Sequence, residues 1–176
     1  MKKLAFLLAL VGFIAGLTVH ILSAGGVDVN EKFSFVWVLH VGVFLVWVPV
    51  MYLLMRDDEF SSLQQAGGMV ALNPLTLFGV CFRGTPRWMT ILIGCCFIYA
   101  VFNIVRFIIS GPADAEIRDG QYTLLSKGKI FAIITEERYH YHRANQLRGF
   151  SGHWIAFYGA AIGILYPLIF HAKRSD

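Results

Sequence analysis

Four long apolar segments constrain the fold of this 176-residue chain more than any other feature of its sequence. They cover approximately residues 4–23, 33–55, 88–109 and 152–171. Each segment has the length, or nearly so, that an α-helix needs to cross a bilayer core of roughly 30 Å at about 1.5 Å per residue. The sequence therefore predicts an all-α integral membrane protein with four transmembrane helices packed as a bundle.

The overall composition agrees with a membrane environment. Hydrophobic residues make up 57% of the chain and charged residues 15%, whereas soluble domains have about 45–50% and about 25%. The net charge of +4 is explained by basic residues that flank membrane spans, and no basic motif with interleaved aromatic residues indicates nucleic-acid binding. The three cysteines form no C-x-x-C pair, so we expect buried thiols and no disulfide framework.

The distribution of basic residues predicts the orientation of the chain. Positive charges precede the first apolar segment and recur in the loop 56–87, which places both of these regions in the cytoplasm. An even number of spans then places the C-terminus there too. The first apolar stretch is long for the core of a secretory signal, so we expect an uncleaved first span. The predicted location is a bacterial-type inner (plasma) membrane, crossed several times, with cytoplasmic N- and C-termini.

The segment 111–150 connects the third and fourth spans and is predicted to form a small extracytoplasmic insert. Residues 122–125 and 130–134 resemble short strands around a tight turn, which indicates a β-hairpin. Thr135 is a favourable N-cap and is followed by two glutamates, so a helix should begin there and run towards Arg148. That helix could end at the glycines that follow or continue into the fourth span. An isolated hairpin is marginally stable, so it should pack on the membrane surface, on its own bundle or on another subunit.

Two further patterns concern helix packing and the cytoplasmic loop. Gly12 and Gly16, and likewise Gly159 and Gly163, form small-residue pairs that would let two helix backbones approach closely. Within the loop 56–87, residues 69–82 are apolar but too short to cross a bilayer. This stretch is typical of an interfacial or re-entrant segment.

Histidines are the first candidates for chemistry. His20, His40 and His153 are all predicted within roughly 10 Å of the outer membrane boundary, and ionisable residues inside a membrane suggest a functional site. These three could bind haem b or a metal ion, with His140 and His142 as additional metal ligands just above the boundary. No carboxylate lies within the spans to orient them, so each histidine could instead hydrogen-bond a neighbour, and we expect no cofactor.

The only weak catalytic candidate is Ser151, in the sequence Gly149-Phe150-Ser151-Gly152-His153. This sequence is close to the G-x-S-x-G motif of serine hydrolases, but His153 replaces the last glycine and no strand precedes it. The same stretch has a simpler interpretation as a membrane-interface anchor. The residues expected to contact a partner or the membrane interface are Tyr139, Tyr141, Arg148 and Trp154.

Two polar residues interrupt the third span. Asn103 and Arg106 are three residues apart and should share one face of the helix. Arg106 can extend to the outer surface, and Asn103 should hydrogen-bond another helix. No inverted repeat accompanies them, which argues against a carrier.

No P-loop, dinucleotide-binding or zinc-protease motif occurs in the sequence. Together these observations favour a non-enzymatic accessory, assembly or interaction subunit that acts through its extracytoplasmic insert. Its expected partners are the lipid bilayer and either a second membrane protein or further copies of the chain. The alternatives are a haem- or metal-binding redox protein and a membrane enzyme that uses Ser151 with a histidine.

Overall fold

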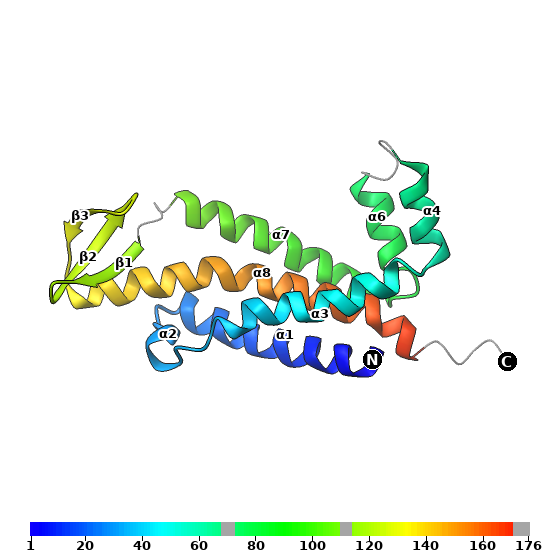
Figure 1. Ribbon diagram of the computed structural model, residues 1–176, viewed down its shortest axis with the longest axis horizontal. Helices are drawn as coiled ribbons and strands as arrows, with labels where there is room; N and C mark the ends of the chain where they lie inside the picture. The colour runs from blue at the N-terminus through cyan, green and yellow to red at the C-terminus, as the bar shows by residue number, and fades with distance from the viewer. Residues whose placement is uncertain (68–72, 110–113, 171–176) are drawn as a thin grey trace.

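Four long helices dominate the computed structural model, which describes residues 1–67, 73–109 and 114–170. These helices are α1 (Lys2–Ala24), α3 (Val38–Leu54), α7 (Arg87–Ile109) and α8 (Glu136–Phe170). The longest, α8, is 35 residues long, which corresponds to roughly 50 Å. Helices α1, α3 and α7 all pack against it, so α8 is the central helix of the bundle (Figure 1).

Three helices of the described chain, α1, α7 and α8, are long and apolar enough to cross a membrane. Helix α3 is followed by α4 (Asp58–Ala66) at a bend of 86°, and this pair makes a fourth candidate if it is counted as one span. The outward surfaces of these helices carry many exposed leucine, isoleucine, valine and phenylalanine side chains. Long apolar helices with apolar outer faces indicate a membrane protein.

The two ends of the bundle carry different elements (Figure 1). The N-terminus, the end of α8 and the helices α4 and α6 (Pro74–Cys81) lie at one end, which we call the terminal end. The rings of Phe6 and Phe170, 5.8 Å apart, bring the start of α1 and the end of α8 together there. The short helix α2 (Val29–Lys32) and a small sheet lie at the opposite end, which we call the sheet end.

The sheet has three antiparallel strands in the order β1-β2-β3, namely β1 (Asp114–Arg118), β2 (Gln121–Ser126) and β3 (Lys129–Ile133). Sequence patterns predicted only the hairpin β2–β3, because the charged residues of β1 are poor strand formers in isolation. Both turns contain two residues with positive φ, Asp119-Gly120 and Lys127-Gly128, as tight hairpins require.

The sheet is attached to the first turns of α8. Ala115 and Leu124 are buried with Tyr139 in a small separate core, and the ring of Tyr122 lies 5.0 Å from that of Tyr139. The hydroxyl of Tyr122 interacts with the carboxylate of Glu136, and this hydrogen bond raises the pKa of Tyr122. The insert therefore packs on its own chain through one helix.

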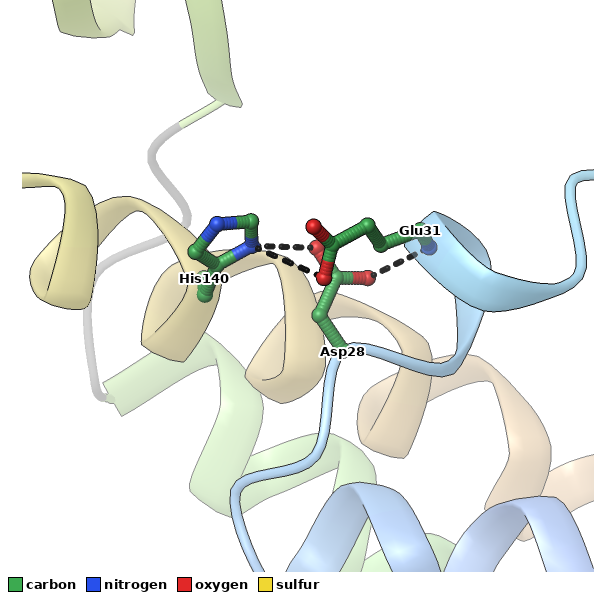
Figure 2. A group of neighbouring side chains, drawn as sticks. All are labelled: Asp28, Glu31 and His140. Carbon is green, nitrogen blue, oxygen red and sulfur yellow. Dashed lines mark hydrogen bonds and ion pairs between the residues drawn. The ribbon is translucent and has the colours of Figure 1, made fainter.

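Thr135 caps α8 as predicted, since its hydroxyl accepts a hydrogen bond from the backbone N–H of Arg138 at 3.4 Å. The helix does not end at Gly149 or Gly152 but continues to Phe170. At the other side of the sheet end, Asp28 caps α2 by accepting a hydrogen bond from the N–H of Glu31 at 3.2 Å. Figure 2 shows this cap facing α8, from which His140 reaches across.

Glycines set the close contact between α1 and α8. A Cβ on Gly12 would overlap the ring of Tyr158, and one on Gly16 would touch the Cβ of Trp154 at 3.6 Å. Gly159 lies against Phe13, and a Cβ on Gly163 would overlap Ile93. Both glycine pairs are therefore helix contact faces, as predicted.

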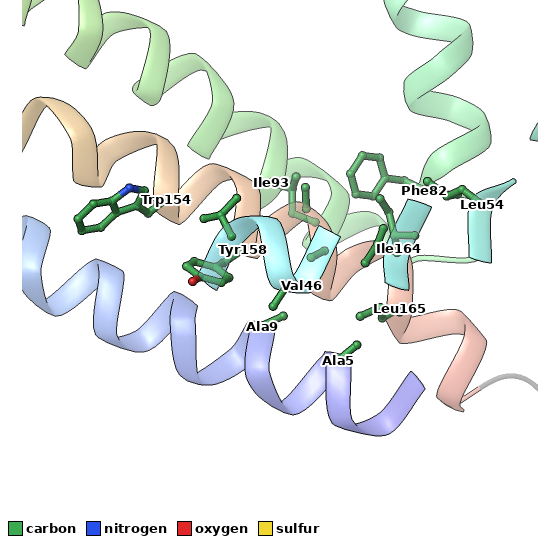
Figure 3. Close-up of a cluster of buried hydrophobic side chains, with 14 of the residues drawn as sticks. Ala5, Ala9, Val46, Leu54, Phe82, Ile93, Trp154, Tyr158, Ile164 and Leu165 are labelled. Atoms are coloured by element: carbon green, nitrogen blue, oxygen red, sulfur yellow. The ribbon is translucent and has the colours of Figure 1, made fainter. Parts of the chain in front are cut away.

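The main hydrophobic core fills the space between the four long helices. Figure 3 shows Ala5 and Ala9 of α1, Val46 of α3 and Ile93 of α7 around Trp154, Tyr158, Ile164 and Leu165 of α8. Small residues on α1 and large ones on α8 interdigitate, which is the packing that glycine and alanine permit between membrane helices.

The loop 56–87 contains two helices that were not predicted. Asp57 caps α4, and Asp58 and Glu59 follow in its first turn, where carboxylates stabilise the positive end of the helix. Asn73 caps α6, which begins at Pro74. The interfacial or re-entrant interpretation of residues 69–82 stays a prediction, because residues 69–72 lie outside the described part of the chain.

Candidate functional site: a buried polar cluster at the sheet end

Buried polar side chains from α1, α7 and α8 meet towards the sheet end of the bundle. They are His20 and Ser23 of α1, Asn103 of α7, and Arg148 and Ser151 of α8, and each is at most 7% exposed. Buried polar groups are normally hydrogen-bonded, so partners for these side chains are expected nearby. Most of them do so in two connected networks.

The first network joins all three helices through His20. Its Nδ1 lies 2.9 Å from the Ser151 hydroxyl and its Nε2 lies 2.5 Å from the Tyr99 hydroxyl. The Ser151 hydroxyl donates to the carbonyl oxygen of Arg148 at 3.3 Å. One proton arrangement satisfies the three bonds, in which Tyr99 donates to Nε2 and Nδ1–H donates to Ser151. Both nitrogens of His20 are then occupied.

The second network holds the guanidinium of Arg148 between two amides. Asn103 Oδ1 accepts from Arg148 Nη1 at 2.8 Å, and Asn145 Oδ1 accepts from Nε at 3.1 Å and from Nη2 at 2.8 Å. Asn103 also donates through Nδ2 to the carbonyls of Arg148 and Gly149. Asn103 therefore hydrogen-bonds another helix, as the sequence predicted.

Ser151 has a histidine neighbour but not the setting of a nucleophile. The serine is fully buried, and its proton is donated to a backbone carbonyl in the arrangement above. The second nitrogen of His20 meets the Tyr99 hydroxyl rather than a carboxylate, whereas a serine hydrolase needs an orienting acid and an accessible hydroxyl. Within the described chain, this geometry fits a structural hydrogen bond better than acyl transfer.

The three histidines expected near the outer boundary are distributed over two places. The rings of His40 and His153 are neighbours, with centroids 5.7 Å apart, and Trp154 donates to His40 Nδ1 at 3.0 Å. His20 lies in the hydroxyl network instead, and the trio is not among the groups of three or more close ligand atoms in the described residues. A groove of about 200 Å³ lies beside His40 and His153, below the roughly 300–1,000 Å³ of typical ligand pockets.

A third cluster links α2 to α8 and contains His140, one of the predicted metal ligands (Figure 2). His140 Nδ1 lies 3.2 Å from Asp28 Oδ2 and 3.7 Å from Glu31 Oε2. The ligand atoms of these three residues lie within 4.8 Å of one another, close enough to share one ion. His142, the other predicted ligand, is not a member of this group.

The partners of Asp28 identify this cluster as an ion-pair network. Oδ1 accepts from the N–H of Glu31, and Oδ2 accepts from Arg143 Nε at 3.2 Å in addition to His140. Both carboxylate oxygens are thus occupied, and a metal ion would face the Arg143 guanidinium. The Asp28 side chain is only 2% exposed, so the pairing is protected from solvent and anchors the α1–α3 connection to α8.

Replacing Asp28 with asparagine should loosen this connection while keeping the cap of α2. The neutral amide weakens two charged hydrogen bonds, each worth about 1.5–3 kcal/mol in protein interiors. We expect the backbone amides of residues 28–32 to lose hydrogen-exchange protection by about 10-fold or more. Glu31→Gln is the matched control, since the Glu31 side chain is 58% exposed and such pairs contribute about 0–1 kcal/mol. An equal loss of hydrogen-exchange protection in both variants would contradict the conclusion that Asp28 anchors this connection to α8.

The residues expected at the membrane interface are mostly inside the protein. Tyr141 is 61% exposed, but Tyr139, Arg148 and Trp154 are 8%, 7% and 0% exposed. The expected surface position is not found for these three residues, because the sheet covers Tyr139, the two amides enclose Arg148, and α1 and α3 cover Trp154. Arg106, in contrast, is at the surface.

The sequence patterns did not single out six residues of these clusters, namely Ser23, Asp28, Glu31, Tyr99, Arg143 and Asn145. Nothing in the sequence near Tyr99 distinguishes it from the other aromatic residues of an apolar helix. Asp28 could have been recognised only as a favourable N-cap residue, which does not predict its ion pairs. No protein family model, curated protein or solved structure matches this chain.

Proposed function

We propose that the chain is a four-span protein of a bacterial-type inner membrane, with α3 and α4 counted as one bent span and with cytoplasmic N- and C-termini. The basic residues near the terminal end support this orientation. Lys2 and Lys3 are the first residues of α1, Arg87 is the first residue of α7, and Arg83 lies just before it. The charges of the sheet end are nearly balanced. This end therefore faces the extracytoplasmic side.

Within that topology, we infer a non-enzymatic accessory or assembly role in which the sheet binds a partner membrane protein. The observation that carries the proposal is a set of apolar side chains on the sheet surface. They are Ile117, Ile130, Phe131 and Ile133, and each is between 53% and 75% exposed. Ile130, Phe131 and Ile133 belong to the edge strand β3, and Ile117 belongs to β1. Exposed apolar side chains in this number on so small a sheet are typical of an interaction surface.

The position of the sheet favours a protein over lipid as its partner. His153 lies at the start of the predicted fourth span, and the sheet packs on Tyr139, fourteen residues earlier in α8. At 1.5 Å per residue, the sheet therefore lies about 21 Å from the start of that span. With α8 near the membrane normal, this distance exceeds the headgroup layer, which adds roughly 5–7 Å on each side of the apolar core. The exposed side chains would then face water unless another protein covers them.

The edge of the sheet offers a defined mode of binding. Strand β3 pairs only with β2 among the described strands, and its outer edge carries Phe131 and Ile133. An extended segment of a partner can pair with such an edge through backbone hydrogen bonds while its apolar side chains cover the exposed ones. The partner should therefore present an apolar strand or loop outside the membrane.

A photo-crosslinking residue at Phe131 tests this function in intact membranes. We expect a discrete crosslinked product with one other membrane protein, and its loss when Ile133→Asp is introduced, because a charge would have to be buried at the contact. The same probe at the exposed Gln64 of α4, at the terminal end, is the matched control. A product that contains only a second copy of the chain would replace the accessory role by self-assembly. Crosslinks to lipid alone would contradict the proposal.

The haem- or metal-binding alternative keeps one favourable observation, the adjacent rings of His40 and His153. An optical spectrum with metal analysis of the purified protein distinguishes it from the accessory role. A Soret band or stoichiometric metal that disappears in His153→Ala would favour a redox function. The arrangement of Ser151 described above gives the enzymatic alternative weaker support.

A further inference from the structure

A small polar cavity opens between α1, α7 and α8 at the sheet end, beside the buried polar cluster. Its volume is about 110 Å³, which is the space of roughly three or four water molecules. Its wall includes Ser23, Tyr99, Arg106, Asn145 and Arg148, and none of the described lining residues is a carboxylate. Arg106 and Tyr99 are exposed at its margin, so the cavity is accessible from outside.

One group in this wall is buried without a partner. The hydroxyl of Ser23 is the one buried side-chain nitrogen or oxygen atom in the described chain that makes no hydrogen bond, and Ser23 as a whole is 3% exposed. Leaving such a group unpaired inside a protein is unfavourable in free energy. A ligand that accepts a hydrogen bond from Ser23 inside the cavity would recover this free energy.

Arg148 also has no counter-charge among the ion pairs of the described residues. Its three hydrogen bonds within the described chain go to the neutral amides of Asn103 and Asn145, and it takes part in none of the ion pairs found there. A guanidinium has five N–H donors, so one remains on each terminal nitrogen. Buried charges are normally paired, so an anion bound in the cavity would supply the counter-charge.

We propose that this cavity binds the phosphate group of an anionic headgroup or of a free phosphate ion, held by Arg148, Arg106 and the Ser23 hydroxyl. Guanidinium groups fit the geometry and charge of a phosphate, and no carboxylate is among the described residues that line this cavity. The cavity lies where α1 ends and close to the end of α7, the level at which lipid headgroups meet a membrane protein, and basic pockets between transmembrane helices bind anionic headgroups. This site is independent of the partner surface on the sheet.

Thermal unfolding of the full chain in non-ionic detergent tests the site. We would add short-chain phosphatidylglycerol, short-chain phosphatidylcholine or sodium phosphate at matched ionic strength. Phosphatidylglycerol should raise the midpoint progressively with concentration, as binding to the folded state requires, and more than phosphatidylcholine does. An equal response to sodium phosphate identifies the phosphate group alone as the ligand, whereas no response to it identifies the lipid.

Two variants link the response to the cavity. Ser23→Ala removes a hydroxyl that the fold does not use, so without ligand the variant should unfold at the wild-type temperature or above it. Its apparent Kd and that of Arg106→Gln should rise about 10-fold or more, because hydrogen bonds to a charged group are lost. Ser62→Ala and Arg87→Gln, at the terminal end, should respond as the wild type does. No stabilisation by phosphatidylglycerol or phosphate, or unchanged affinity in both cavity variants, would overturn the proposal.

Discussion

Replacing Trp154 with alanine is expected to remove a large part of the stability of the helix bundle. The indole ring is fully buried, packs against the ring of Trp37 at a centroid distance of 5.8 Å, and donates to His40 Nδ1. Truncating a buried tryptophan to alanine costs about 3–5 kcal/mol, mostly through the cavity that remains. For a chain of this length the loss corresponds to a thermal midpoint lower by roughly 6–20 °C.

Circular dichroism during heating in mild detergent measures this effect, and Trp88→Ala is its matched control. Trp88 is 64% exposed at the start of α7, so its truncation should change the midpoint by no more than a few degrees. Similar shifts for both variants would show that Trp154 does not fill the space between α1, α3 and α8.

The Asn103→Leu variant should have the next largest effect. Leucine keeps roughly the size of asparagine but leaves the Arg148 guanidinium without one acceptor and two carbonyls without their donor. Hydrogen bonds between membrane helices average about 0.6 kcal/mol, but hydrogen bonds to charged groups contribute about 1.5–3 kcal/mol. Because Asn103 is 1% exposed and Arg148 is 7% exposed, we expect the larger value, a loss of about 2–3 kcal/mol.

Equilibrium unfolding with a denaturing detergent measures the free energy, with the exposed Gln65→Leu of α4 as control. A loss below about 0.6 kcal/mol would contradict a special role for the charge of Arg148. The same variant should also weaken phosphate binding if Asn103 positions Arg148 in the cavity. A loss of stability with unchanged affinity for phosphate would show that Asn103 supports the fold but does not position Arg148 for binding.

Local patterns predicted much of the fold. The apolar segments became α1, α3, α7 and α8, and both glycine pairs became helix contacts. The hairpin and the helix start at Thr135 were also predicted correctly. Each of these features depends on residues within a few positions of one another, through turn geometry, capping or helical spacing. Strand β1 was missed because its partner β2, rather than its own composition, stabilises it.

The candidate site could be predicted only in part. His20 was suspected because an ionisable residue inside a membrane is costly, but its partners Ser151 and Tyr99 are 131 and 79 residues away in the chain. The sequence grouped His20, His40 and His153 by their predicted depth in the membrane. In the structure, the side chain of His20 points to Ser151, whereas those of His40 and His153 lie next to each other. Depth follows from sequence position, but direction depends on how each helix is rotated against its neighbours.

The sequence by itself determined that the chain has long membrane helices, where they lie, and which small residues let them approach, because hydrophobicity, length and side-chain size are properties of the residues alone. The tertiary structure alone decided that Arg148 and Trp154 are buried between helices rather than exposed on the protein surface, and that Asp28 pairs with Arg143 and His140. It also brought the Ser23 hydroxyl, Arg106 and Arg148 to one cavity. The physical reason is that burial and hydrogen bonding depend on which faces of α1, α7 and α8 meet, and no single segment contains that information.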